Sequence, residues 1–207
     1  MLRGLPQNGP TDPIEYYKRP LVGRVFLERI NMGLRLLGGN SLGRVLEVGY
    51  GAGAVLLTLA PLASELQGID LDADPAPVRR VLADRGHEAK LTRGSVYELP
   101  YGDGQFDVVV CFSVFEHLHE FERGLREIRR VLVPGGRFLL GMPAVNRMME
   151  WGFRAIGFKN IEDHHVTTPR SVARAFRTSG FVTEQKRYLG APIDGLALYY
   201  TWLLRAV

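Results

Sequence analysis

Short apolar runs alternate with longer amphipathic segments through the middle of the chain. The runs are four to six residues long, as buried strands are, and the segments between them repeat apolar residues every three or four positions, as helices do. Such alternation predicts βαβ units around a parallel sheet. The expected strands are residues 44–48, 66–69, 89–92, 106–111 and 136–141, followed by two closing strands at 181–188 and 196–204.

Local start and stop signals delimit the helices. Asp74 followed by Pro75 is an N-cap and first-turn pair. The amphipathic segment 121–132 is expected to end at Pro134-Gly135. The expected helices are residues 54–62, 75–85, 121–132, 169–180 with a start signal at Thr168-Pro169, and a first one from Tyr16 to the Gly38-Gly39 pair.

The N-terminal region divides into two parts. Residues 1–13 contain three prolines and two glycines, which break helices and strands, so they are expected to form a loose leader. We expect residues 1–40 to comprise this leader and a helical cap, and residues 41–207 to form the main domain. Residues 145–167, apolar and aromatic, are expected to be a variable insertion on the substrate side.

Composition excludes several classes of protein. The chain has 207 residues, of which 46% are apolar and 23% charged, so it fits one globular domain. Its one cysteine, Cys111, lies in an expected core strand and excludes an internal disulfide, which favours a reducing, cytoplasmic location. A net charge of +4 does not imply a nucleic-acid partner.

No membrane-spanning segment is expected either. The most apolar stretch, residues 196–204, is about half as long as a spanning helix needs to be. The chain also opens without the apolar core of a signal peptide. Peripheral contact with a membrane surface stays open, because the insertion combines aromatic residues with Arg147, Arg154 and Lys159.

The segment VLEVGYGAG, residues 45–53, carries the most informative motif. An apolar strand runs into Gly49, Gly51 and Gly53 and a helix follows, so that the backbone can pass close to a ligand. Glu47 stands at the carboxyl end of that strand, where a carboxylate repels a pyrophosphate and favours a cationic amine or sulfonium. The spacing GxGxG also differs from the GxGxxG of dinucleotide binding. For the glycines alone, a tight packing turn is the alternative.

Asp70 is the second landmark. It ends the run GID about 20 residues after Gly49, where an acidic side chain can accept two hydrogen bonds from ribose hydroxyls. A helix-capping carboxylate is the alternative. The acidic run 70–74 begins like a calcium loop, but Pro75 and Val81 replace the glycine and glutamate that such a loop requires.

These motifs resemble those of class I S-adenosylmethionine-dependent methyltransferases, nearest to the broad type-11 group that includes quinone-biosynthesis C-methyltransferases. The likeness covers about residues 44–142 and includes the later segments GSVYELPYGDGQFDVVVCFSVFEHL and RRVLVPGGRFLLGMP. It implies an α/β, Rossmann-like, doubly wound, mostly parallel seven-stranded sheet with helices on both faces and an antiparallel last strand. It also implies S-adenosylmethionine as cofactor and S-adenosylhomocysteine as product.

The resemblance further assigns the cofactor-binding residues. Glu47 and the three glycines would hold the methionine end, and Asp70 would hold the ribose. The backbone of Val96 would face the adenine edge, with Leu71 and Phe112 against the ring.

Two positions depart from the family's pattern. Ser95 stands where the family usually has Asp, and its uncharged hydroxyl is expected to lower adenine affinity by about 1 kcal/mol. Tyr50 stands where a small residue or Cys is common. It is expected to contact the cofactor's carboxylate or to narrow the site.

Catalysis requires mainly alignment of the acceptor with the methyl group, helped by a base that takes the acceptor's proton. His117 follows the fourth strand and is a candidate base, with a structural hydrogen bond as the alternative. Glu116 beside it is expected to point to solvent or to cap a helix. His165 is a second candidate base or substrate contact. His164 and His165 are adjacent and point apart in an extended segment, so no metal site is expected.

Substrate choice is expected to come from outside the matched core. Tyr16 and Tyr17 of the N-terminal helix and Trp151 of the insertion are the candidate substrate contacts, for a small, apolar or lipid-like acceptor. The alternatives are a non-catalytic binding protein of the same fold and an NAD(P)-dependent oxidoreductase, which Glu47 and the GxGxG spacing disfavour. No pattern indicates the acceptor atom or an oligomeric state.

Overall fold

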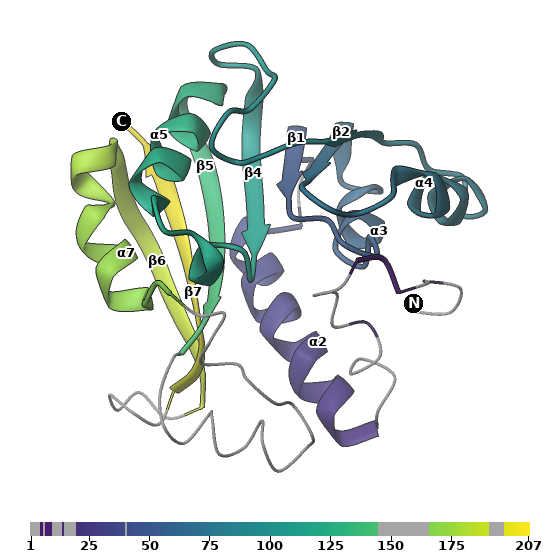
Figure 1. Cartoon of the computed structure of the whole chain (residues 1–207), viewed down its shortest axis with the longest axis horizontal. Coiled ribbons are helices and arrows are strands. Elements are labelled where there is room, and N and C mark those ends of the chain that lie inside the picture. Colours follow the sequence, from purple (N-terminus) through teal and green to yellow (C-terminus); the bar gives the residue numbers. More distant parts are fainter. Residues whose placement is uncertain are drawn as a thin grey trace.

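A seven-stranded sheet organises the molecule (Figure 1). The computed structural model describes residues 5, 7–9, 14, 20–39, 41–144, 166–190 and 197–207. The sheet order is β3-β2-β1-β4-β5-β7-β6, and the strands are β1 (Gly43–Val48), β2 (Ala63–Asp70), β3 (Lys90–Arg93), β4 (Phe106–Phe112), β5 (Leu132–Pro143), β6 (Phe181–Gly190) and β7 (Ala197–Ala206).

Strands β1 to β5 pair in parallel, and β7 runs antiparallel to both β5 and β6. This confirms the expected doubly wound, mostly parallel sheet with an antiparallel last strand. The chain builds β1, β2 and β3 outward in one direction and then crosses to β4 on the other side of β1. The reversal between β1 and β4 is the point where such sheets bind ligands, at the carboxyl ends of the strands.

Helices cover both faces of the sheet (Figure 1). One face carries the helices that precede β4 in the chain, and the other carries those that follow it. The described helices are α2 (Pro20–Leu34), α3 (Leu56–Leu59), α4 (Pro75–Ala83), α5 (Phe121–Val131) and α7 (Pro169–Ala175), with the 3-10 turns η1 (Arg35–Leu37), η2 (Phe115–His117) and η3 (Arg177–Ser179).

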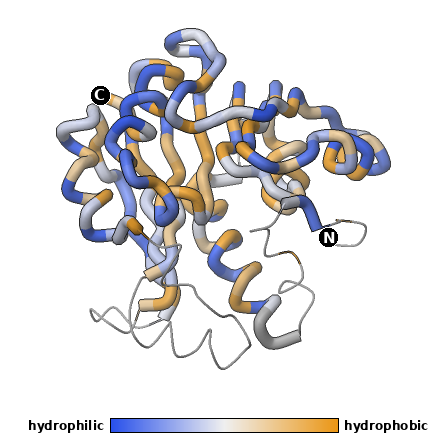
Figure 2. The backbone as a smooth tube through the Cα atoms, in the orientation of Figure 1, coloured by the Kyte–Doolittle hydropathy of each residue, from blue (hydrophilic) through white to orange (hydrophobic). Residues whose placement is uncertain are grey.

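Two apolar cores lie on the two faces, because successive side chains of a strand point to opposite sides. In β4, Val108 and Val110 join the core under α2, α3 and α4, whereas Val109 and Cys111 join the core under α5 and α7. Hydrophobic residues accordingly follow the central strands, as Figure 2 shows. Cys111 is fully buried, as predicted.

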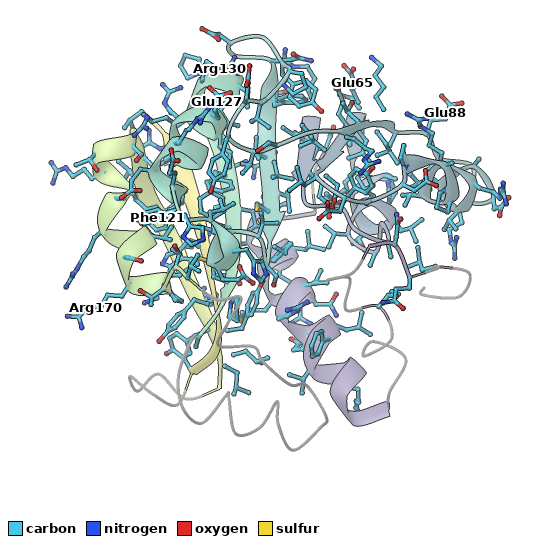
Figure 3. The ribbon with its side chains drawn as sticks, in the orientation of Figure 1. Glu65, Glu88, Phe121, Glu127, Arg130 and Arg170 are labelled. Carbon is cyan, nitrogen blue, oxygen red and sulfur yellow. The ribbon has the colours of Figure 1, made fainter. Side chains whose placement is uncertain are left out.

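Polar pairs complete the outer faces of the helices. On α5, Arg130 and Glu127 lie together (Figure 3), with 2.8 Å between Nη2 and Oε2, and Arg130 also donates to the Leu99 carbonyl. This pair ties α5 to the loop before β4. None of the helices in the described part of the chain has the length and hydropathy needed to span a membrane.

The local signals located the helix ends well. Asp74 accepts a hydrogen bond from the Ala76 backbone at 2.9 Å, and Thr168 accepts one from the Ser171 backbone at 3.2 Å, so both predicted caps are confirmed. Gly180 is left-handed with φ of 82°, which ends the η3 turn as expected.

Two predicted boundaries were wrong. The helix expected over residues 54–62 is only the four residues of α3, because turns occupy both of its flanks, and the Leu62 N–H bonds to the Leu59 carbonyl three residues back. Pro134-Gly135 does not follow α5 as a separate stop. Leu132 already pairs with Phe106, and the proline and glycine lie inside β5, where the register with β4 shifts.

Candidate functional site

A cavity of about 600 Å³ opens at the carboxyl ends of β1, β2, β3 and β4. Its floor is the turn after β1, and its sides are the turns after the other three strands. The N-terminal residues Asn8, Gly9 and Ile14 and the α2 residues Arg29 and Ile30 complete the wall. The cavity therefore lies where the strand order reverses, as the glycine motif predicted.

The glycine turn is required by backbone conformation and by space. Gly49, Gly51 and Gly53 have φ values of 79°, 48° and 84°, a region that other residues rarely adopt. A Cβ on Gly49 would overlap Val114, and one on Gly53 would lie 2.6 Å from Cγ1 of Val78. Packing thus accounts for part of the motif, while the cavity beside it leaves the backbone open to a ligand.

Glu47 is a buried carboxyl on the floor of this cavity. Its side chain is 3% exposed, and Oε2 has no hydrogen-bond partner among the described residues. Burial raises the pKa of Glu47 well above its ordinary value; the charge of Asp70 adds to this, and a hydrogen bond from the Leu56 backbone opposes it. A cationic ligand group would satisfy Oε2 and favour the ionised form. This orphaned oxygen fits an ammonium or sulfonium and does not fit a pyrophosphate.

Asp70 organises the turns on which the cavity is built. Its Oδ2 accepts from the Gly51 backbone at 2.9 Å, and its Oδ1 accepts from the backbones of Asp72 and Ala73 at 3.0 and 2.9 Å. It does not cap α4, because Asp74 fills that role. A carboxylate has about four acceptor positions, so about one remains for a ribose hydroxyl.

The predicted adenine contacts fall on two sides of the sheet. Leu71 is a 63% exposed apolar side chain at the rim, and Ser95 and Val96 line the same part of the cavity. Ser95 Oγ accepts from the Tyr97 backbone at 3.2 Å. Val96 belongs to the core under α5 and α7. Phe112 belongs to the core under α2, α3 and α4, and it packs against Gly33 of α2 and Gly141 of β5.

Phe112 and Leu71 both line the cavity, so their contact with one adenine ring stays a prediction. Along β4 the side chains alternate, so Cys111 faces the α5 side, where Val96 also packs, and Phe112 faces α2.

Tyr50 is buried, and its hydroxyl donates to the Ala73 carbonyl at 3.3 Å. Burial, with Asp70 nearby, raises the pKa of Tyr50 to about 12. The hydroxyl is thus directed at the β2–α4 turn, while the residue also lines the cavity, so contact with a cofactor carboxylate or narrowing of the site stays a prediction. The ring packs beside Gly68, where a Cβ would lie 2.9 Å from Cδ1.

Glu116 was wrongly expected to point to solvent. It is 2% exposed, because the η2 turn folds it inward and its backbone carbonyl accepts from Val166 and Thr167. Burial raises its pKa to about 8, with Arg29 among the groups that oppose the rise. His117 is exposed and lines the cavity.

Four predicted residues lie outside the described residues: Tyr16, Tyr17, Trp151 and His165. The insertion 145–167 is described only at its last two residues, 166 and 167. No group of three His, Cys, Asp or Glu side chains in the described ranges is placed to hold a metal ion.

Sequence reasoning missed a polar cluster at the end of β4. Arg29 Nη1 donates to Ser113 Oγ at 3.1 Å, and Ser113 Oγ lies 3.0 Å from the Tyr199 hydroxyl. Ser113 has φ of 57°, an uncommon value for a residue with a side chain. An arginine within the apolar stripe of α2 was the one signal that pointed to this cluster.

The prediction of a loose leader was also wrong where the structure describes it. Leu5 and Asn8 are only 3% and 7% exposed. The Asn8 amide bonds to the glycine turn and to the β2–α4 turn. No local pattern in the leader indicated these contacts, because their partners are 43 and 66 residues away.

Known proteins are similar to this core in sequence and in fold. Residues 46–140 match the family model described as Methyltransferase domain, of type 11. The uncharacterised methyltransferase YcgJ of Bacillus subtilis is 32% identical over 121 residues, 56% of this chain and 48% of that protein. The demethylmenaquinone methyltransferase of Thermus thermophilus is 33% identical over 100 residues, 47% of this chain and 46% of that protein.

The chain thus spans about half the length of these curated relatives. Among solved structures, protein PH0226 of Pyrococcus horikoshii is similar with a TM-score of 0.73, covering 93% of this chain and 99% of that one. At 18% identity this likeness concerns the fold alone.

Proposed function

We propose that this protein is a class I S-adenosylmethionine-dependent methyltransferase of type 11 that methylates a small, apolar acceptor, because residues 46–140 match the Methyltransferase domain model of that type. S-adenosylhomocysteine is the second product. The observation that carries the proposal is the buried Glu47 carboxyl, whose Oε2 lacks a partner on the floor of a cavity bordered by glycines. A carboxylate at that position attracts a positively charged group of a cofactor and repels a phosphate.

The chain's residues divide the cofactor among them. Glu47 takes the cationic methionine end beside the turn of Gly49, Gly51 and Gly53. Asp70 offers its remaining acceptor position to a ribose hydroxyl. Leu71, Ser95 and Val96 receive the adenine. Tyr50 supports the turn from below through its bond to the Ala73 carbonyl.

The acceptor side is the wall under α2. Ile14, Ile30 and Phe112 make this part of the cavity apolar, and Arg29 with Ser113 adds a polar corner. The Thermus relative is named for demethylmenaquinone. An acceptor of comparable kind, small and largely apolar, is the class we propose here.

Catalysis then rests on alignment and on removal of one proton. When bound, S-adenosylmethionine supplies a methyl group on a positively charged sulfur, transferred by in-line displacement. His117 at the rim is the proposed general base that takes the proton from the acceptor, and His165 is the second candidate. Tyr16, Tyr17 and Trp151 remain the proposed substrate contacts.

The proposed enzyme acts in the cytoplasm on a small molecule, without a nucleic-acid partner and without a metal. Residues 1–40 cap the domain 41–207, and residues 145–167 provide the variable part of the acceptor site.

Ligand-dependent unfolding tests the cofactor. S-adenosylhomocysteine at a hundred times its Kd should stabilise the protein by about 2.7 kcal/mol, which differential scanning fluorimetry detects. NAD(H) should produce no shift. A shift with NAD(H) alone would refute the proposal in favour of an oxidoreductase. Mass spectrometry of apolar acceptors incubated with S-adenosylmethionine then checks for a gain of one methyl group, and binding without transfer would favour a non-catalytic protein.

A further inference from the structure

The described residues of the N-terminal segment reach the glycine turn. In Figure 1 this segment, in dark purple, passes beside α3, and three of its residues, Asn8, Gly9 and Ile14, line the cavity. Leu5 and Ile14 are buried in the apolar core under α2, α3 and α4, so they attach the segment to the domain on both sides of Asn8.

Asn8 makes three hydrogen bonds with its side-chain amide. Its Nδ2 donates to the carbonyls of Gly51 and Asp74, and its Oδ1 accepts from the Asp74 backbone, each at 2.9 Å. With 7% exposure, it is a buried polar group whose donors and acceptor are used on two turns at once. Only an amide presents a donor and an acceptor in this arrangement.

Asn8 and Asp70, the proposed ribose-binding residue, both connect the glycine turn to the β2–α4 turn. Asp70 binds the Gly51 N–H through Oδ2 and the Ala73 N–H through Oδ1. Asn8 binds the Gly51 carbonyl and both backbone groups of Asp74, the next residue. The two side chains thus bind the same two turns, and the glycine turn cannot shift without breaking bonds to one of them.

We propose that Asn8 is a positioning residue of the cofactor site, and that docking of the N-terminal segment and cofactor binding stabilise each other. This rests on the proposed cofactor site. The physical reason is linkage. A ligand that binds one arrangement of the turns at Gly51 and Asp70 favours the docked N-terminal segment, which holds the turns in that arrangement. The docked segment in turn raises the affinity for the ligand by the same factor.

Two variants of Asn8 and one matched control test this. Asn8→Ala removes the three bonds and should raise the Kd for S-adenosylhomocysteine about tenfold. Asn8→Asp keeps the acceptor for the Asp74 N–H but sets a carboxylate oxygen against two carbonyls, so it should weaken binding at least as much. Isothermal titration calorimetry measures the Kd, and thermal unfolding without ligand measures the cost to the fold.

Asp107→Ala is the control. Asp107 also accepts three bonds, from the Arg44 backbone, Nε and Nη2 at 2.8, 3.1 and 3.0 Å, but at the amino ends of β1 and β4, the edge opposite the cavity. It should lower the melting temperature by a similar amount and leave the Kd within about twofold. A purely structural Asn8 would behave as Asp107 does.

Hydrogen exchange on the wild-type protein gives a second readout that needs no variant to fold. Saturating S-adenosylhomocysteine should slow amide exchange in peptides covering Leu5 to Ile14, while peptides at the start of β4 stay unchanged. Unchanged exchange in the N-terminal peptide, or an Asn8→Ala Kd equal to that of the wild type, would overturn the inference. If the wild-type protein binds no S-adenosylhomocysteine at all, the proposed function fails, and this inference with it.

Discussion

The backbone N–H of Gly51 donates to Oδ2 of Asp70 at 2.9 Å, so the turn after β1 is tied to the last residue of β2. One carboxylate therefore serves two purposes. It holds the glycine turn through one backbone bond and the β2–α4 turn through two, and it keeps about one acceptor position for a ligand hydroxyl.

Replacing this carboxylate should weaken cofactor binding strongly. Asp70→Ala loses the ribose contact and releases the glycine turn, and the expected loss of affinity for S-adenosylhomocysteine is about 1–3 kcal/mol. Calorimetric titration measures it. Asp72→Ala is the control, because Asp72 lies at the same rim and contributes only its backbone N–H to the turn. An unchanged Kd for Asp70→Ala would remove Asp70 from the ribose role.

Ser95 offers a change that should tighten binding. Ser95→Asp restores a charged acceptor opposite the adenine amino group. It should strengthen the binding free energy of S-adenosylhomocysteine by about 1 kcal/mol, which lowers the Kd. The Tyr97 N–H, which Ser95 Oγ now binds, remains within reach of the new carboxylate. Adenosine analogues lacking the amino group provide the check, since their affinity should not improve. Equal gains for both ligands would show that the charge acts elsewhere.

Glu116 should make stability fall as pH rises. Its folded pKa is about 8, above the ordinary value of 4.5, so the folded state holds a proton that the unfolded state has released between these two values. Between these pH values the free energy of unfolding falls as pH increases, and this contribution of Glu116 is fully lost above pH 8. Urea unfolding at pH 5, 6.5 and 8 measures this slope.

Glu116→Gln should flatten the slope and stabilise the protein most at pH 8, because the amide carries no charge to bury. The buried Glu47 contributes a slope of the same sign and remains in this variant, so part of the dependence should persist. A slope identical to that of the wild-type protein would contradict the burial of an ionisable Glu116.

The contact between α2 and Phe112 should be sensitive to one methyl group. In Gly33→Ala the new Cβ would lie 2.7 Å from Cζ of Phe112, and this overlap should outweigh the better helix propensity of alanine, for a net loss of about 1 kcal/mol in unfolding free energy. Gly39→Ala is the matched control. Its Cβ would meet nothing within 4 Å, so stability should stay the same or rise slightly.

The sequence predicted the parts of the site that depend on short stretches of chain. The glycine turn and Asp70 each follow a strand directly, and the carboxyl ends of parallel strands meet at one edge, so their proximity followed from the pattern. The cap of α4 at Asp74 was equally local.

The sequence was less informative where a side chain's direction depends on turn shape or on distant contacts. Phe112 lines the predicted cavity, but its packing against Gly33 of α2 is a contact between distant segments that no local pattern indicates. Glu116 is buried by the η2 turn, whose inward fold no local pattern indicates. Asn8 and Arg29 act on residues 43 to 84 positions away, a distance that no helical or strand period reports.

The placement of the cavity between β1 and β4 has a consequence for folding kinetics. Val45 pairs with Val108, a contact that closes a loop of 62 intervening residues, and such distant pairings form slowly. The cavity gains its β4 side only after this step, so partly folded chains should lack binding competence. S-adenosylhomocysteine should therefore slow unfolding rather than accelerate folding, because its site is complete only once β4 has joined β1.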